Sequence, residues 1–321
     1  MDALSDVLKA VRLSGAVYFD IHASEPWVAE TPAGRSVVAA MFPGSEHLIS
    51  YHVLLGGTCW ATIEGHEPIQ LSAGDVIVFP HGDTHVLSSV PGLSAKPNMS
   101  MYRRQVEGVF PATIAMGKGS AVSANFVCGF LGCDARPFNP LLAALPRVIR
   151  VSDDASGTLG SYVKFALAES KLSRIGGESV LSRLSELMFL HVVRRYLETL
   201  PADKADWLSG LRDQPVGRAL AALHRKPARA WTLQTLAREA GISRSVLAER
   251  FTKFVGYPPI EYLTNWRMQL AANQLRGSTA SVVEVANDVG YESEAAFSRA
   301  FKKAVGAPPS EWRKSRASAG G

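Results

Sequence analysis

Two stretches decide the fold at the C-terminal end of this chain: LAREAGISRSVLAERFTKFVGYPP at 236–259 and VANDVGYESEAAFSRAFKKAVGAPP at 285–309. They are copies of one pattern, in which Gly241 matches Gly290, Gly256 matches Gly306, and each copy ends in Pro-Pro. The pattern predicts a helix, a tight turn at the first glycine, and a second helix that the prolines stop. A helix-turn-helix unit of this kind places its second helix in the major groove of DNA. One copy could occur in any small helical domain, but two matched copies predict sequence-specific DNA binding.

Short polar residues mark where these helices begin. Thr232 precedes the first helix of the first copy, and Ser243 and Ser293 precede the two second helices, so we expect all three to be N-caps. Between the copies, apolar residues recur at helical spacing over 260–276, which predicts one rigid connecting helix. A rigid connector suits two groove segments one DNA turn, ~34 Å, apart. The buried face of the second helix in the first copy is expected to be Val246, Leu247, Phe251, Phe254 and Val255.

The side chains that reach base edges are expected at the exposed start of each second helix. Arg244 is suited to guanine, and Glu294 is suited to cytosine. Cations further along each helix are better placed for phosphates. Because the copies differ at these positions, one chain should read two different half-sequences. The candidate DNA-binding residues are Ser243, Arg244, Ser245, Glu249, Arg250 and Lys253 in the first copy, and Ser293, Glu294, Ser298, Arg299 and Lys302 in the second.

The distribution of charge agrees with this prediction. Residues 213–316 contain 16 Lys/Arg and 9 Asp/Glu, a net charge of +7, although the whole chain has a net charge of only +5. The excess of positive charge is therefore confined to the repeat region, as expected where phosphates are neutralised. Many helical domains are mildly basic, so the charge supports the repeat and is not sufficient alone.

The repeat region resembles the AraC/XylS family of bacterial transcription regulators. The resemblance rests on the doubled motif, on YLTNWRMQLAANQLR at 262–276 between the copies, and on GYESEAAFSRAFKKAVGAPPSEWR at 290–313, which looks like the signature segment of the family. It implies a two-lobed, seven-helix domain that binds double-stranded DNA and activates or represses transcription. An activator would also contact RNA polymerase.

The N-terminal part has a different character. Between about residues 15 and 130, short apolar runs such as LISYHVLL and DVIVF are separated by Gly, Pro and Ser, which predicts a β-barrel or jelly roll. GDVIVFPHGDTHVL at 74–87 resembles the second cupin motif, with Gly74, Pro80, Gly82 and His85 at its spacing. One large subgroup of AraC-type regulators carries a cupin at this end. The fold class is therefore expected to be α+β and multidomain.

The cupin resemblance raises the question of a metal. Cupin enzymes hold a metal mainly with histidines and a glutamate, yet here the first motif offers only Glu46, while His85 matches the second. His52 shares the strand parity of an inward-facing residue, and His81 lies near His85. These four are the candidate residues for a ligand or a metal such as zinc. Because they do not form a full ligand set, a sensor for a small-molecule effector is favoured over an enzyme, with no catalytic residue assigned.

Cys128 and Cys133, in CGFLGC, leave three interpretations open. They are core residues, or they join the nearby histidines around zinc, or they are redox-sensing thiols. Cys59 is the third cysteine of the chain. An odd and small number of cysteines is typical of reduced thiols in the cytoplasm, where the protein is expected, at the nucleoid when bound to DNA.

Helical spacing returns after the β-rich part. A long apolar stripe from Val180 to Tyr196 predicts a helix that packs on the barrel or forms a homodimer. The expected domains are a sensor at 1–135, a dimerisation segment at 136–200, a linker at 201–214, a DNA-binding domain at 215–316 and a disordered tail at 317–321. We expect no membrane association, because the chain has no apolar run of about 18 residues.

The sequence therefore predicts a transcription regulator that responds to a small-molecule or redox signal at its barrel. Two alternatives remain: a cupin metalloenzyme with an appended DNA-binding module, and a constitutive DNA-binding dimer whose barrel senses nothing.

Overall fold

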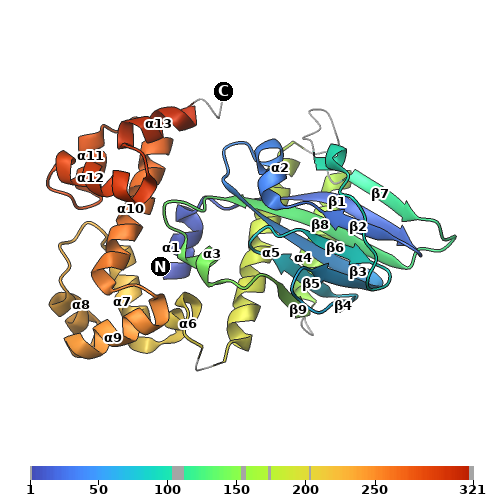
Figure 1. The fold of residues 1–321 in the computed structure, drawn as a ribbon, viewed down its shortest axis with the longest axis horizontal. Coiled ribbons are helices and arrows are strands. Elements are labelled where there is room, and N and C mark those ends of the chain that lie inside the picture. The colour runs from blue at the N-terminus through green and yellow to red at the C-terminus, as the bar shows by residue number, and fades with distance from the viewer. Residues whose placement is uncertain (1, 103–111, 153–156, 173–174, 202–203, 318–321) are drawn as a thin grey trace. The chain divides into compact units, whose positions relative to one another are not determined.

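The structure, a computed structural model, describes residues 2–102, 112–152, 157–172, 175–201 and 204–317 (Figure 1). The chain forms two compact units, each built from segments that are apart in the sequence. We call Leu13–Cys133 with Pro146–Thr199 the sheet unit. We call Met1–Arg12, Asp134–Leu145 and Leu200–Gly321 the helical unit.

The sheet unit contains a curled, mainly antiparallel sheet in the strand order β2-β6-β3-β8-β1-β7, which confirms the predicted β-rich N-terminal fold. Its longest strand, β3, also pairs with β4 and β5, and β9 pairs with β5. A register shift between Leu54 and Gly56 interrupts the pairing of β3 with β8. The strands are β1 (Ser14–Ser24), β2 (Val28–Thr31), β3 (His47–Ile63), β4 (Ile69–Ser72), β5 (Asp75–Phe79), β6 (His85–Ser88), β7 (Ala112–Gly117), β8 (Ala124–Cys133) and β9 (Ile149–Ser152).

Strand register brings three side chains of the sheet interior together. Cys128 of β8 is opposite His52 of β3 on one side and Phe19 of β1 on the other. Residues directly opposite one another on neighbouring strands share a face of the sheet. The concave interior is mainly apolar, with Trp27, Phe126 and other buried side chains forming its core.

In the described part of the sheet unit, the helical segments are α2 (Gly34–Met41), the short 3₁₀ helix Met99–Tyr102, α4 (Thr158–Lys171) and α5 (Gly177–Thr199). Helix α5 packs so closely on β1 that a Cβ added at Gly15 would lie only 2.5 Å from the Cβ of Ser185. The hydroxyl of Ser185 is also 3.0 Å from the hydroxyl of Tyr51. The predicted long apolar helix is thus present and partly covers the sheet.

The helical unit contains α1 (Ala3–Ala10), α3 (Pro140–Ala144), α6 (Trp207–Arg212), α7 (Gln214–Arg225), α8 (Leu233–Ala240), α9 (Arg244–Val255), α10 (Pro259–Gly277), α11 (Val282–Asp288), α12 (Glu294–Val305) and α13 (Pro309–Ala317). Helix α10 is continuous, as predicted for the connector, and runs between α7–α9 at one end and α11–α13 at the other (Figure 1). Tyr262 and Trp266 of α10 are buried on the first lobe, and Ala271 and Leu275 are in the core of the second.

The compact units do not follow the domain ranges expected from the sequence. Helix α1 and residues 134–145 belong to the helical unit, although they were expected in the sensor and dimerisation segments. The expected linker contains α6, and its Trp207 and Leu208 are buried. The indole of Trp207 donates to the Tyr262 hydroxyl at 3.1 Å. Residues 318–321 of the expected tail lie outside the described residues, and Ala317 ends α13. Among the described residues, no helix has the length and apolar character that a membrane span needs.

Candidate functional sites

The two predicted recognition helices are α9 and α12, and each begins at its predicted cap. The hydroxyls of Ser243 and Ser293 accept from the amides of Val246 and Ala296, each at 3.4 Å. Gly241 has a φ of 73°, and Gly290 has a φ of 84°, which is the left-handed conformation that the turns require. One residue lies between Gly241 and its cap Ser243 and two lie between Gly290 and its cap Ser293, so the extra residue of the second copy lies in the turn.

Most of the candidate base-reading side chains are accessible to DNA. Exposed residues are Ser243, Arg244, Ser245, Glu249, Ser293 and Glu294, whereas Ser298 is half-buried. Val246 was expected on the buried face, but its side chain is 45% exposed, because it follows the start of α9 beside the base-reading positions. Val246 is therefore an apolar candidate that sequence reasoning missed, suited to contact with a thymine methyl group.

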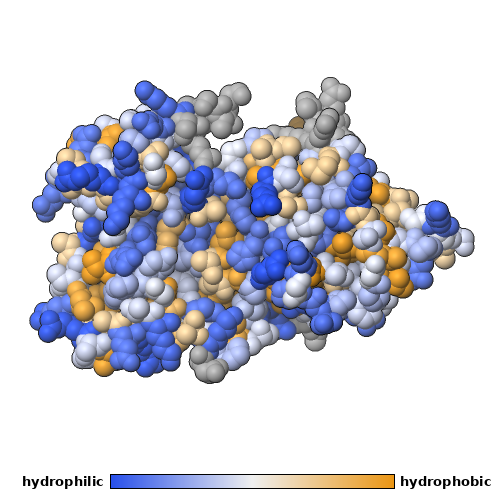
Figure 2. All heavy atoms as spheres, in the orientation of Figure 1, coloured by the Kyte–Doolittle hydropathy of each residue, from blue (hydrophilic) through white to orange (hydrophobic). Residues whose placement is uncertain are grey.

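The candidate phosphate contacts differ in their surroundings. Lys253, Arg299 and Lys302 are exposed. Arg250 instead donates through Nε to Oδ2 of Asp213 at 2.8 Å, and this contact raises the pKa of its guanidinium. Asp213 also caps α7, so Arg250 ties α9 to α7. In Figure 2 the visible outer faces of the helical unit carry mainly hydrophilic side chains, with scattered apolar ones between them.

One face of the connecting helix α10 binds the two segments that precede β1 and follow β8. The buried amide of Gln269 donates to the carbonyl of Ala10 at 2.9 Å and accepts from the amide of Phe138 at 3.0 Å. Asn273, one turn further on, also donates to the Ala10 carbonyl, at 2.5 Å. At the end of this face, Arg276 is ion-paired with Asp134.

Asp134 is the centre of this contact. Its side chain is 1% exposed and accepts from Arg276 Nη1 at 2.5 Å and from Arg12 Nε at 2.8 Å. Its backbone amide donates to the carbonyl of Val11 at 2.8 Å, so the segments stay paired where they leave β1 and β8. We call Gln269, Asn273, Arg276 and Asp134, with the backbone of Ala10, the α10 clasp. Nothing in the helix-turn-helix repeat predicted it.

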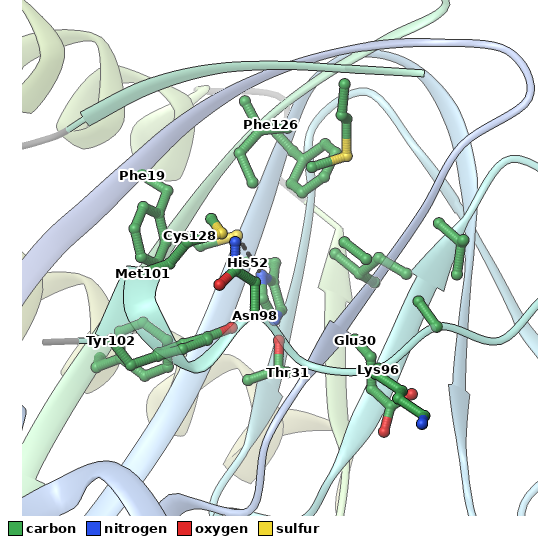
Figure 3. Close-up of a pocket in the computed structure, with 17 residues that line it drawn as sticks. Phe19, Glu30, Thr31, His52, Lys96, Asn98, Met101, Tyr102, Phe126 and Cys128 are labelled. Atoms are coloured by element: carbon green, nitrogen blue, oxygen red, sulfur yellow. Dashed lines mark hydrogen bonds between the residues drawn. The ribbon is translucent and has the colours of Figure 1, made fainter. Parts of the chain in front are cut away.

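The sheet unit encloses a cavity of about 130 Å³ (Figure 3). Its wall is mainly aromatic and aliphatic, but Glu30, Lys96 and Asn98 also line it, with Lys96 beside Glu30 and Asn98 near His52. His52 is the only one of the candidate histidines that lines it, and Cys128 is beside it. The side chains that surround these two include Phe19, Ile21, Thr31, Leu87, Met101, Tyr102, Met116, Phe126 and Phe130.

Cys128, His52 and His85 form a buried hydrogen-bonded chain. Sγ of Cys128 is 2.9 Å from Nδ1 of His52, and Nε2 of His52 is 2.7 Å from Nε2 of His85. Nδ1 of His85 is 2.8 Å from the carbonyl oxygen of Asp83. The ring of His85 also stacks on Phe79 with centroids 3.6 Å apart.

The donor and acceptor of each hydrogen bond in this row of side chains follow from its last bond, the one between His85 and Asp83. The carbonyl of Asp83 can only accept, so Nδ1 of His85 carries a hydrogen. Burial lowers the pKa of His85 to about 4 and lowers the pKa of His52 well below its ordinary value, so both rings are neutral. Nε2 of His85 must then accept from His52, whose Nδ1 accepts in turn from the Cys128 thiol. Burial also raises the pKa of Cys128, which keeps the thiol protonated as the donor.

The other predicted barrel residues lie elsewhere. His81 is exposed in the loop after β5, and Glu46 precedes β3, where its amide donates to the carbonyl of Cys133. Cys133 is five residues from Cys128 on β8, on the opposite face and about 17 Å away at ~3.4 Å per residue. The two cysteines therefore do not meet at one site. In the described part of the chain, no three His, Cys, Asp or Glu side chains are arranged to hold a metal ion.

Two family models match the two halves of the chain. A family model described as Cupin matches residues 2–198, and one described as a helix-turn-helix domain matches residues 236–315. The DNA-binding domain of AdpA, solved with a target DNA, is 27% identical and covers 33% of this chain and 96% of that chain, with a TM-score of 0.32.

Full-length relatives are similar along nearly the whole chain. An AraC-like transcription regulator of Streptomyces lividans is 34% identical over 319 residues, with 98% of each chain covered. The HTH-type transcriptional regulator AlkR of Acinetobacter baylyi is 27% identical, with 98% of this chain and 99% of that protein covered. The RCS-specific transcriptional activator RclR of Escherichia coli is 26% identical over 98% of this chain and 97% of that protein. The chain belongs to the AraC-like DNA-binding transcription regulators, with a cupin domain toward its N-terminus and a helix-turn-helix domain at its C-terminal end.

Proposed function

We propose that the cavity of the sheet unit binds a small signal molecule and that its occupation changes the affinity of α9 and α12 for an operator. The observation that carries this proposal is the path of the chain. Strands β1 and β8 supply Phe19, Phe126, Cys128 and Phe130 to the cavity wall, and the same strands continue directly into the segments that the α10 clasp holds.

The clasp offers a physical route for the signal. Helix α10 holds both lobes of the DNA-binding domain, so a change in its contacts with Ala10 and Asp134 changes how the two recognition helices are presented. A ligand shifts such an equilibrium only by its difference in affinity for the two states. A ligand that binds more tightly to one arrangement of β1 and β8 than to another has such a difference in affinity.

A sensor is favoured over an enzyme. Both ring nitrogens of His52 already have partners, Cys128 and His85, so neither can bind a metal of the cupin-enzyme type without breaking these hydrogen bonds. A metal such as zinc held by His52, His85 and Cys128 would require those rings to turn toward a common point. The constitutive alternative predicts an operator affinity that no cavity ligand alters.

We propose a homodimer formed through α4 and α5. Phe165 of α4 and Leu187 of α5 are large apolar side chains that are 55% and 44% exposed. They lie one turn from the ring contact between Tyr162 and His191, so they belong to one apolar surface on this helix pair. Leu187→Glu should then reduce the dimer mass measured by sedimentation and leave the fold intact.

The remaining proposals concern the cellular setting. The target is double-stranded promoter DNA, with RNA polymerase as a second partner if the protein activates transcription. The cytoplasm is favoured because all three cysteines are free and buried. A direct test is selection of operator fragments from genomic DNA, followed by affinity measurement with and without single-ring aromatic compounds. A shift with one of them supports the sensor, and equal affinity with all of them supports the constitutive alternative.

A further inference from the structure

The chain from Cys128 to His85 has the arrangement of an activated nucleophile. An activated cysteine needs a base within hydrogen-bond reach, and that base needs a third group to orient it. Here Nδ1 of His52 is 2.9 Å from the Cys128 sulfur, and Nε2 of His52 is fixed by His85 at 2.7 Å. The Asp83 carbonyl fixes His85 in turn.

The position of the thiol distinguishes it from the other cysteines of the chain. Cys128 lines the cavity, whereas Cys59 and Cys133 do not. Figure 3 shows Cys128 and His52 side by side, with Phe19, Phe126 and Tyr102 around them. The thiol therefore faces a space that a small molecule can occupy.

We propose that Cys128 is a covalent modification site for small, uncharged electrophiles of one-ring size, the class of the quinones. The cavity volume is about 130 Å³, and an engineered cavity of about 150 Å³ binds benzene, so one ring is the appropriate size. Apart from Glu30 and Lys96, the wall is mainly apolar, which disfavours the entry of charged reagents. The hydroxyls of Thr31 and Tyr102 line the same cavity and can donate to a carbonyl oxygen.

The chemistry balances without an external oxidant. The Cys128 sulfur forms a bond to a ring carbon of the quinone, and the π electrons of that carbon–carbon double bond move to the conjugated carbonyl oxygen. The thiol proton passes to Nδ1 of His52, while Nε2 of His52 continues to donate to His85. The proton then moves from His52 to the carbonyl oxygen. Enolisation of the second carbonyl completes a hydroquinone thioether that contains every atom of both reactants.

The hydrogen bonds from Cys128 through His52 to His85 limit which reagents the thiol reacts with. Burial raises the pKa of Cys128, so no thiolate is present to react with polar oxidants in solvent. Reaction needs a molecule that fills the cavity while His52 takes the proton. Modification of Cys128 does not depend on whether the cavity controls DNA binding. Any effect of the modification on DNA binding rests on the proposed function.

The test uses the full-length protein and 1,4-benzoquinone, with the adduct located by intact mass and peptide mapping. Cys133→Ser is the matched control, because Cys133 is a buried cysteine of the same strand that faces away from the cavity. We expect one quinone on the native chain and on Cys133→Ser, and none on Cys128→Ser. His52→Gln should slow the reaction by about 10²-fold, the usual contribution of a general base.

Several results would overturn the proposal. They are an equal rate of modification in Cys128→Ser, first reaction at Cys59 or Cys133, an unchanged rate in a folded His52→Gln variant, and a purified protein whose Cys128 is blocked by bound zinc. Operator affinity of the modified protein separates the two claims. An adduct at Cys128 with unaltered affinity supports the modification and contradicts the proposed signalling.

Discussion

Asp134, the residue that directly follows β8, is buried and ion-paired with Arg276, the residue before the last of α10. The pair ties the residue that follows the strand of Cys128 to the helix that joins the two helix-turn-helix lobes. A sequence of cupin and helix-turn-helix motifs gives no reason to expect it. Asp134 lies about 80 positions before the start of the expected DNA-binding domain at residue 215.

The first prediction concerns this ion pair. Asp134→Asn should lower the free energy of unfolding of the helical unit by roughly 3–5 kcal/mol, because Arg276 stays buried without its counter-charge. Hydrogen exchange of the α10 amides measures the loss. Glu198→Gln is the control, since it breaks the exposed pair with Arg195 and should cost at most about 1 kcal/mol. Equal effects of the two substitutions would show that the clasp does not stabilise α10.

The second prediction concerns base reading by α9. Arg244 is exposed directly after the cap of that helix and is expected to contact guanine. Arg244→Ala should relax the base preference at one operator position, with a loss of about 1–3 kcal/mol of discrimination there. Binding to a library of single-base operator variants measures this. An unchanged preference at every position would place base reading elsewhere on the helix.

The third prediction concerns phosphate contact by α12. Lys302 is exposed in the last turn of that helix. Lys302→Ala should weaken binding to all sequences alike and reduce the slope of log K against log salt by about 1. Titrations at several salt concentrations measure the slope. Arg250→Ala should affect this slope less, because Arg250 is already paired with Asp213; the reverse order would contradict the assignment.

The fourth prediction concerns pH. His224 is stacked on Trp266 with centroids 4.1 Å apart, and Nε2 of its ring is 2.8 Å from the Tyr262 hydroxyl. Burial lowers the pKa of His224 to about 3 from the ordinary 6.5. The unfolded chain therefore binds the proton first as pH falls, so this contribution to stability is complete above pH 6.5 and is lost toward pH 3.

The expected slope for that loss is about 1.4 kcal/mol per pH unit. Hydrogen exchange of α7 and α10 between pH 4 and 7 measures it, because those helices contain His224, Tyr262 and Trp266. In His224→Gln the slope for these helices should become nearly flat. An identical slope in the variant would mean that another group controls acid stability.

Much of the helical domain follows from the sequence because its signals are local. Caps at Thr232, Ser243 and Ser293 and glycine turns at Gly241 and Gly290 depend only on neighbouring residues, and all five were predicted correctly. The continuous helix α10 follows from apolar spacing in the same way.

The cavity and the clasp depend on strand register, which the sequence does not state. His52 and Cys128 are 76 positions apart, and only the pairing of β3 with β8 puts them together. The same alternation separates Cys128 from Cys133, so their closeness in sequence is misleading. Asp134 and Arg276 meet across 142 positions. No periodicity within either segment points to the other.

A footprint of the purified protein on its selected operator shows whether α9 and α12 read different sequences. We predict an asymmetric site in which one chain protects two different major-groove segments one turn, ~34 Å, apart. Arg244→Ala should alter one segment only, since α9 and α12 present different residues. Protection without sequence preference, or a palindrome within the reach of one chain, would contradict the assignment of two distinct readers.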